Sequence, residues 1–208
     1  MTAGTQFDFI HRFVPPLPGG PKETLLLLHG TGGDEDDLIP LAGELLPGAA
    51  LISPRGRALE NGMPRFFRRL AEGVFDLDDL KVQTDALAQF VSTVSRKHGL
   101  EDNKIIALGY SNGANIAASL LLMHPALLSR AILFRPMVPF RPERSPNLND
   151  MPVLLAAARH DQIVRPEQTA ELSKILTTAG ACVSIHWHPG GHELGADDVA
   201  AAQEWLSR

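Results

Sequence analysis

Short, continuous apolar runs alternate along this chain with segments whose apolar residues recur every three or four positions. The first pattern indicates buried strands and the second indicates amphipathic helices. Six strands are predicted, at residues 24–29, 49–53, 104–109, 130–134, 153–158 and 183–188, with an edge strand or hairpin around residues 7–14. Helices are predicted at residues 36–46, 77–97, 112–124, 166–179 and 197–207.

Strands that alternate with helices are typical of an α/β fold, in which helices cover both faces of a mainly parallel sheet. A chain of 208 residues suits one such domain, so we expect residues 1–208 to form a single domain. Two long connections rich in proline, glycine and arginine, residues 54–76 and 135–151, interrupt the alternation. Long loops in compact domains are commonly functional, so we expect these two to border a site.

Charge argues against a nucleic-acid-binding protein, because the formal net charge is −5. The basic cluster of Arg65, Arg68 and Arg69 is followed directly by acidic residues, which favours a local surface role over phosphate binding. The expected partner is therefore a small molecule. A homodimer is left open.

The single cysteine, Cys182, stands among apolar residues and is expected to be a small buried side chain. One cysteine cannot form an intrachain disulfide, which favours a reducing compartment. The first ten residues do not resemble a secretory signal, and no apolar run approaches membrane-spanning length. We therefore expect a cytoplasmic protein without stable membrane association.

Residues 105–113 read Ile-Ile-Ala-Leu-Gly-Tyr-Ser-Asn-Gly, an apolar run that ends at a serine between two glycines. This is the G-x-S-x-G pattern of a nucleophile elbow, in which a sharp strand-to-helix turn holds the serine above the sheet. A predicted strand precedes Ser111 and a predicted helix follows it, as that turn requires. The alternative is an ordinary glycine-rich turn.

A serine nucleophile needs a base and an acid that orients the base. Asp161 follows the predicted strand 153–158, and His192 lies in a glycine-rich loop between the last strand and the last helix. The order serine, acid, histidine is that of hydrolases with such an elbow. A capping role for Asp161 is the alternative, and His186, His188 and His192 could together be imagined as zinc ligands, although the sequence shows no zinc-binding motif.

An acyl-transfer site also needs N–H donors for an oxyanion. The backbone N–H of Asn112 follows the nucleophile, and the loop Gly30-Thr31-Gly32-Gly33 follows the first parallel strand, so we assign the second donor to Thr31. A phosphate-binding loop is the competing interpretation, but the glycine spacing fits neither common phosphate-loop motif.

With these motifs in order, the chain resembles the phospholipase/carboxylesterase family of α/β-hydrolases from about residue 24 to its end. Residues 61–67 and 73–76 are similar to a branch of small bacterial hydrolases. The resemblance implies a Ser111–Asp161–His192 triad, an acyl-enzyme and no cofactor. No metal is expected either, because the sequence shows no zinc-binding motif. Tyr110, Asn112 and Thr31 depart from the acyl-protein thioesterase pattern, and no room is left for a large cap domain.

The expected function is that of a serine carboxylesterase for small to medium carboxylic esters. A lysophospholipase or acyl-protein thioesterase is one alternative, and a non-hydrolytic sensor of a small ligand is another, since fold alone does not establish activity. Apolar residues of the two long connections are the candidates for the substrate pocket: Phe66, Phe67, Met137, Val138 and Phe140.

Overall fold

A computed structural model describes residues 9–101 and 104–208 and contains one seven-stranded sheet. In spatial order the strands are β1 (His11–Val14), β3 (Ala50–Pro54), β2 (Thr24–Leu28), β8 (Ile105–Tyr110), β9 (Arg130–Phe134), β10 (Pro152–Ala158) and β11 (Cys182–His188). β1 pairs antiparallel with β3, and the other neighbours are parallel. The predicted α/β fold is confirmed, and β1 is the expected edge strand; residues 7–8 of that prediction lie outside the described residues.

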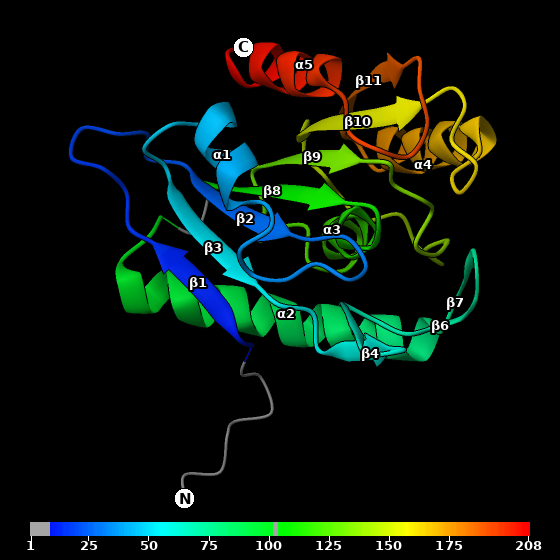
Figure 1. Ribbon diagram of the computed structural model, residues 1–208, viewed down its shortest axis with the longest axis horizontal. Helices are drawn as coiled ribbons and strands as arrows, with labels where there is room; N and C mark the ends of the chain where they lie inside the picture. Colours follow the sequence, from blue (N-terminus) through cyan, green and yellow to red (C-terminus); the bar gives the residue numbers. More distant parts are fainter. Residues whose placement is uncertain (1–8, 102–103) are drawn as a thin grey trace, which may run out of the picture.

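Helices cover both faces of the sheet (Figure 1). α1 (Ile39–Leu45) and α5 (Ala196–Leu206) pack on one face, where a core cluster includes Leu45, Leu108 and Trp205. α2 (Leu77–His98), α3 (Asn112–Met123) and α4 (Pro166–Thr178) cover the other face. The interior strands β2, β3, β8, β9 and β10 each contribute apolar side chains to both clusters, which explains why they appear as continuous apolar runs rather than alternating patterns.

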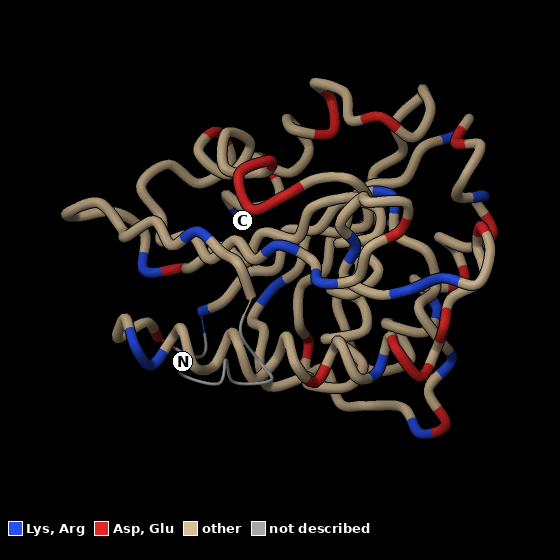
Figure 2. Tube along the Cα trace, turned by 60° about the horizontal axis from the view of Figure 1, so that its bottom comes forward, with Lys and Arg blue, Asp and Glu red and all other residues tan. Residues whose placement is uncertain are grey.

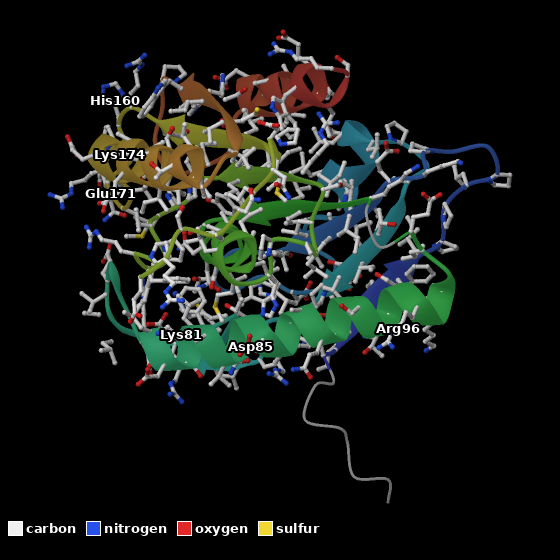
Figure 3. All side chains as sticks on the ribbon, turned by 180° about the vertical axis from the view of Figure 1, so that it is seen from behind. Lys81, Asp85, Arg96, His160, Glu171 and Lys174 are labelled. Atoms are coloured by element: carbon white, nitrogen blue, oxygen red, sulfur yellow. The ribbon has the colours of Figure 1, made fainter. Side chains whose placement is uncertain are left out.

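The longest helix, α2, shows how local sequence sets an element's limits. Asp76 caps its first turn by accepting a hydrogen bond from the N–H of Asp79, and Gly99 ends it with a φ of 64°. Lys81, Asp85 and Arg96 are exposed along this helix (Figure 3), opposite the stripe that packs on the sheet. The helix is amphipathic, as its 3.6-residue pattern predicted.

Chain connectivity places the carboxyl ends of β2 and β8 at a switch in the winding of the sheet. From β2 the chain passes to β3 on one side, and the later strands β8 to β11 follow on the other side. Loops that leave adjacent strands in opposite directions open a crevice, the usual ligand position in open parallel sheets. The loops at this point carry Thr31 and Ser111.

The connection 54–76, interpreted from the sequence as a long loop, contains two short hairpins. They are β4 (Ala58–Glu60) with β5 (Met63–Arg65), and β6 (Arg69–Ala71) with β7 (Val74–Phe75), and we call them the wall hairpins. The first turns at Asn61 and Gly62, whose φ angles are both positive, and an Asn-Gly pair is a strong hairpin signal that the loop interpretation overlooked. The connection 135–151 contains no helix or strand, and no large cap covers the described chain.

Two further expectations change. α1 begins at Ile39 rather than at residue 36, with a proline in its first turn. Cys182 is exposed, not buried, because it begins β11, the last strand of the sheet, which has a neighbour on one side only.

The helices of the described residues include none that is long and apolar enough to cross a membrane. Acidic and basic residues are both spread along the trace (Figure 2), in keeping with the modest net charge.

Candidate active site

Ser111 lies on a sharp turn between β8 and α3. Its backbone angles, φ 52° and ψ −111°, are rare for residues other than glycine. Its N–H donates to the carbonyl of Phe134 on β9 at 2.9 Å, which anchors the turn to the sheet. A Cβ on Gly109 would approach the backbone N of Ala114 to 2.7 Å, and one on Gly113 would overlap the carbonyl of Leu28. Both glycines are therefore required by the close approach of strand and helix.

A continuous chain of hydrogen bonds links Ser111 to His192 and Asp161. His192 Nε2 lies 2.9 Å from Ser111 Oγ, and His192 Nδ1 lies 2.8 Å from Asp161 Oδ2. An ionised carboxylate can only accept, so in this arrangement Nδ1 carries the imidazole proton and Nε2 is free to accept from the serine hydroxyl. The three residues predicted separately from the sequence are brought together at the carboxyl edge of the sheet.

The carboxylate of Asp161 is held on both of its oxygens. While Oδ2 faces His192, Oδ1 accepts from the N–H groups of Ile163 at 2.8 Å and Val164 at 2.9 Å. The Asp161 side chain is only 1% exposed. This carboxylate therefore both caps the turn that follows β10, which was the alternative considered from the sequence, and orients the imidazole.

A fully buried arginine, Arg135, holds the loop that carries His192. Its guanidinium donates to the carbonyls of Gly191 at 3.2 Å and Glu193 at 2.8 Å, on either side of the histidine. It also makes two hydrogen bonds, of 2.9 and 2.7 Å, to the buried carboxylate of Asp198 on α5. The φ of Arg135 is 55°, so its place just after β9 depends on an uncommon backbone conformation that sequence patterns do not reveal.

The loop after β2 is fixed from both ends. The ring of His29 is buried; its Nδ1 donates to the carbonyl of Gly30 at 2.6 Å, and its Nε2 accepts from the N–H of Gly56 at 2.9 Å. Burial is the main cause that lowers the pKa of His29, which keeps this ring neutral. Gly32 N–H donates to the carbonyl of Pro64, which ties the loop to β5.

The backbone N–H groups assigned as oxyanion donors, those of Thr31 and Asn112, donate to no other group within residues 9–101 and 104–208. Both residues line the cavity at Ser111, and the second lies at the start of α3, where the helix dipole favours negative charge. Two N–H groups left without partners at the same cavity suit an anion. The oxyanion role of these two groups stays a prediction.

Two asparagines in the first turn of α3 each anchor one of the two long connections beside the cavity. The side-chain carbonyl of Asn112 accepts from Phe66 N–H, and that of Asn115 accepts from Met137 N–H, each at 2.7 Å. Asn115 was not identified from the sequence. An asparagine on an apolar helix was the available signal, because a buried amide in such a position usually has a specific partner.

The cavity at Ser111 has a volume of about 270 Å³. Besides Ser111, His192, Thr31 and the two asparagines, its wall is formed by Arg65, Arg69, Gly73, Phe75, Tyr110, Met137 and Ile163. Phe66 and Phe67 do not belong to this wall: both are fully buried and pack in the core. Their expected pocket role is corrected, because the chain after β5 turns these rings inward toward the sheet and presents Arg65 to the cavity.

A second cavity of about 340 Å³ shares Gly73, Phe75 and Met137 with the first. Val138 and Phe140, the remaining pocket candidates, line this second cavity and not the one at Ser111. The lining of the second cavity also includes Arg141 and Glu171, which pair at 2.6 Å. The connection 135–151 thus contributes apolar residues next to the site, as expected, although only Met137 reaches the cavity of Ser111.

The zinc alternative does not fit the contacts of His188 and His192. Both nitrogens of His192 are engaged with Ser111 and Asp161. His188 lies near Asp197 and Asp198, with potential ligand atoms within 4.8 Å of one another. Arg135 already occupies both carboxylate oxygens of Asp198, so a cation there would meet a guanidinium. His188 instead pairs with Asp197 at 2.7 Å.

The winding of the sheet, the turn at Ser111 and the loops beside it define the α/β-hydrolase fold. Within that class the chain belongs to the phospholipase/carboxylesterase family, whose model matches residues 18–208. The chain is accordingly a carboxylic-ester hydrolase, and the family resemblance recognised from the sequence is confirmed.

Individual relatives support this membership. The putative hydrolase MhqD of Bacillus subtilis is 46% identical over 187 residues, which cover 90% of this chain and 94% of MhqD. The crystal structure of the Bacillus cereus carboxylesterase superposes with a TM-score of 0.91 at 45% identity, covering 94% of this chain and 92% of that one. A structure of YahD with malic acid gives a TM-score of 0.89 at 35% identity, over 96% and 98% of the two chains.

Proposed function

We propose that this protein is a serine carboxylesterase in which Ser111 is the nucleophile, His192 the general base and Asp161 the orienting acid. The observation that carries the proposal is the unbroken hydrogen-bond chain from Asp161 Oδ2 through the imidazole of His192 to Ser111 Oγ, with lengths of 2.8 and 2.9 Å. Both lengths lie in the range of a hydrogen bond, which proton transfer from the serine requires.

The proposed reaction has two halves. His192 Nε2 takes the proton of Ser111 as its Oγ attacks the ester carbonyl, and the imidazolium formed is stabilised by Asp161. The alcohol leaves with the proton from His192 and an acyl-enzyme remains. A water molecule, deprotonated by the same imidazole, then attacks the acyl group and releases the acid. The reaction uses side chains, backbone N–H groups and water.

The oxyanion of each tetrahedral intermediate would be bound by the N–H groups of Thr31 and Asn112. They are supported by elements that do not need to move during the reaction: Thr31 by its loop, tied to β5 through Gly32, and Asn112 by α3. Donors already in position before charge develops are an effective electrostatic contribution, and losing one such donor typically costs about 100-fold or more in kcat.

Small to medium carboxylic esters suit the dimensions of the site. The cavity of about 270 Å³ at Ser111 is at the lower limit for small-molecule pockets, and the adjoining cavity, which Val138 and Phe140 help to line, offers room for a moderately longer group. The relative from Bacillus cereus is a carboxylesterase, and one structure of YahD is with malic acid, a small carboxylic acid. We therefore expect kcat/KM to peak at short acyl chains in a series from acetyl to palmitoyl p-nitrophenyl esters.

Replacing the nucleophile tests the proposal directly. Ser111→Ala should lower kcat on p-nitrophenyl acetate by at least about 10⁴-fold and abolish labelling by a fluorophosphonate probe. Ser145→Ala, at an exposed serine of the connection 135–151, is the matched control and should keep both properties. Substantial turnover or labelling in Ser111→Ala would refute the assignment, and tight binding of an ester that is never cleaved by the unaltered protein would favour the sensor alternative.

A further inference from the structure

Two arginines line the cavity of Ser111 and, apart from the titratable His192, are the charged side chains of its described wall. Arg65, at the end of β5, is 3% exposed, and the side chain of Arg69, at the start of β6, is 30% exposed. Arg68, between them, is instead 64% exposed in its side chain and pairs with Asp76. The basic cluster interpreted from the sequence as local surface is therefore divided, and two of its three members face the candidate site.

The charge of the two arginines is only half compensated. Glu60 is the carboxylate paired with both: its Oε1 accepts from Arg69 Nε at 2.8 Å, and its Oε2 lies 3.2 Å from Arg65 Nη1. The hydrogen bond from Arg69 is the main cause that lowers the pKa of Glu60, so this group is ionised at neutral pH. Two guanidinium groups and one carboxylate leave one positive charge at the cavity.

Hydrogen-bond donors are left over as well. Arg65 donates through Nε to the carbonyl of Phe67 and through Nη1 to Thr31 and Glu60, while its Nη2 has no partner among the described residues. Arg69 uses only Nε, and neither of its Nη groups donates to another described residue. A guanidinium stays charged even when buried, so an unpaired face of Arg65 favours an anion.

The position of these donors relates them to the reaction. Arg65 Nη1 donates to Thr31 Oγ1 at 2.7 Å, and the backbone N–H of Thr31 is the proposed oxyanion donor. Arg65 therefore contacts the same residue, Thr31, whose N–H group is expected to bind the oxygen of the ester carbonyl. An anionic group a few bonds from that carbonyl would meet Arg65 within the same cavity, and the burial of this guanidinium strengthens its charged hydrogen bonds.

We propose that Arg65 and Arg69 form an anion subsite and that the preferred substrates are carboxylic esters that carry a carboxylate near the scissile bond. Half-esters of short dicarboxylic acids are the simplest examples on the acyl side, and acetylated hydroxy acids on the alcohol side. The inference rests on the proposed function, because it assigns a substrate class to the same Ser111. Glu60 sets the strength of the subsite by neutralising one of the two positive charges.

Matched ester pairs test the proposal by proton release in a pH-stat at low salt. Monoethyl succinate is compared with ethyl butyrate, and 3-acetoxypropanoate with butyl acetate, so that each pair differs chiefly in one carboxylate. At least one pair should show kcat/KM about tenfold higher for the anionic ester, the usual size of one charge-assisted hydrogen bond. The ratio should fall as sodium chloride is raised to 0.5 M, because salt screens the attraction.

Variants of the two hairpins sharpen this test. Arg69→Met should lower the anionic-to-neutral ratio severalfold, and Glu60→Gln should raise it, because it removes the compensating charge. Arg68→Met, an equivalent change at the exposed arginine between them, is the control and should leave the ratio unchanged. Arg65→Met should also lower the ratio, with its folding checked by thermal unfolding because Arg65 is buried.

Binding gives a readout that does not depend on hydrolysis. Calorimetry with succinate should show binding to the unaltered protein, about tenfold weaker in Arg69→Met and unchanged in Arg68→Met. Ratios near one for both ester pairs, or no succinate binding, would overturn the anion subsite while turnover of neutral esters leaves the proposed function standing. Succinate binding without turnover of any ester would instead support the subsite and contradict the proposed function.

Discussion

The groups proposed for catalysis and the wall that faces the substrate are built in opposite ways. Ser111 and Asp161 come shortly after the interior strands β8 and β10, and His192 lies in a loop that Arg135 holds. Asp161 and Arg135 are both buried. The wall hairpins, residues 58–75, are short, expose Leu59, Leu70 and Val74, and rely on partly exposed ion pairs. This contrast indicates that the sheet fixes the reaction geometry and that the hairpins can change substrate preference without disturbing it.

The largest expected effect tests whether the buried carboxylate of Asp161 acts only by orienting the ring of His192. Asp161→Asn keeps an oxygen that can accept from Ile163 and Val164, but its amide would place a donor against the donor at His192 Nδ1. The histidine would then favour the wrong tautomer, and kcat should fall by about 10⁴-fold. Ester hydrolysis and urea unfolding measured on the same protein should show a loss of activity with a small change in stability.

If the Asp161→Asn protein loses most of its stability, the carboxylate is chiefly a structural cap of the turn after β10. The contrast between the catalytic groups and the wall hairpins would then be weaker. Asp150→Asn, in the exposed connection before β10, is the comparison variant and should keep full activity.

Removal of the buried guanidinium should cost stability first. Arg135→Met leaves the carboxylate of Asp198 without its ion-pair partner, and an uncompensated buried charge costs about 3–5 kcal/mol. Activity should also fall, because the carbonyls of Gly191 and Glu193 lose the donor that holds the His192 loop. Urea unfolding and kcat measured at a temperature where the variant is folded separate the two losses.

The double variant Arg135→Met/Asp198→Leu sharpens the interpretation. It removes both charges, so stability should recover in part while kcat stays low. Full recovery of kcat would show that Arg135 does not position the histidine loop.

Because the ring of His29 is buried and neutral, the stability of the folded protein should depend on pH. Its pKa is lowered, mainly by burial, so below the ordinary histidine value near 6.5 the unfolded chain binds more protons than the folded one. The stability that His29 contributes is therefore complete above about pH 6.5 and is lost as the pH falls toward the folded-state pKa, by at most about 1.4 kcal/mol per pH unit. Urea unfolding between pH 7.5 and 5 measures this slope.

His29→Gln is the control for that slope, because an amide can still donate and accept but does not titrate in this range. The difference in stability between the two proteins should shrink on acidification. A difference that stays constant with pH would contradict a neutral ring in the folded state.

The smallest effect is expected in the wall hairpins. Gly62 has a φ of 81° at the turn between β4 and β5, with open space around it, so Gly62→Ala adds backbone strain and no clash. Stability should fall by about 1 kcal/mol, and KM should change more than kcat because the hairpin carries Arg65. Steady-state kinetics and thermal unfolding measure both, and a larger fall in kcat than rise in KM would show that the hairpin also supports the reaction geometry.

The parts predicted best from the sequence are those in which local chemistry and position along the chain coincide. The turn at Ser111 requires Gly109 and Gly113 because of atoms within and directly beside the same strand-turn-helix unit. Asp161 and His192 were chosen by their places after predicted strands, and the structure brings them within hydrogen-bond distance of each other. The Asn61-Gly62 hairpin was equally visible in the sequence, but the surrounding proline and arginine residues favoured an interpretation as loop.

The sequence by itself determined the α/β class, the positions of the strands along the chain and the residues able to act as nucleophile, base and acid, because these depend on periodicity and on short motifs. Only the tertiary structure decided which of three neighbouring arginines face the cavity, that Phe66 and Phe67 enter the core, and that Arg135 supports the histidine loop. The physical reason is that burial and long-range pairing depend on groups far apart in the chain, such as Arg65 with Thr31 and Arg135 with Asp198. No local pattern of residues specifies those partners.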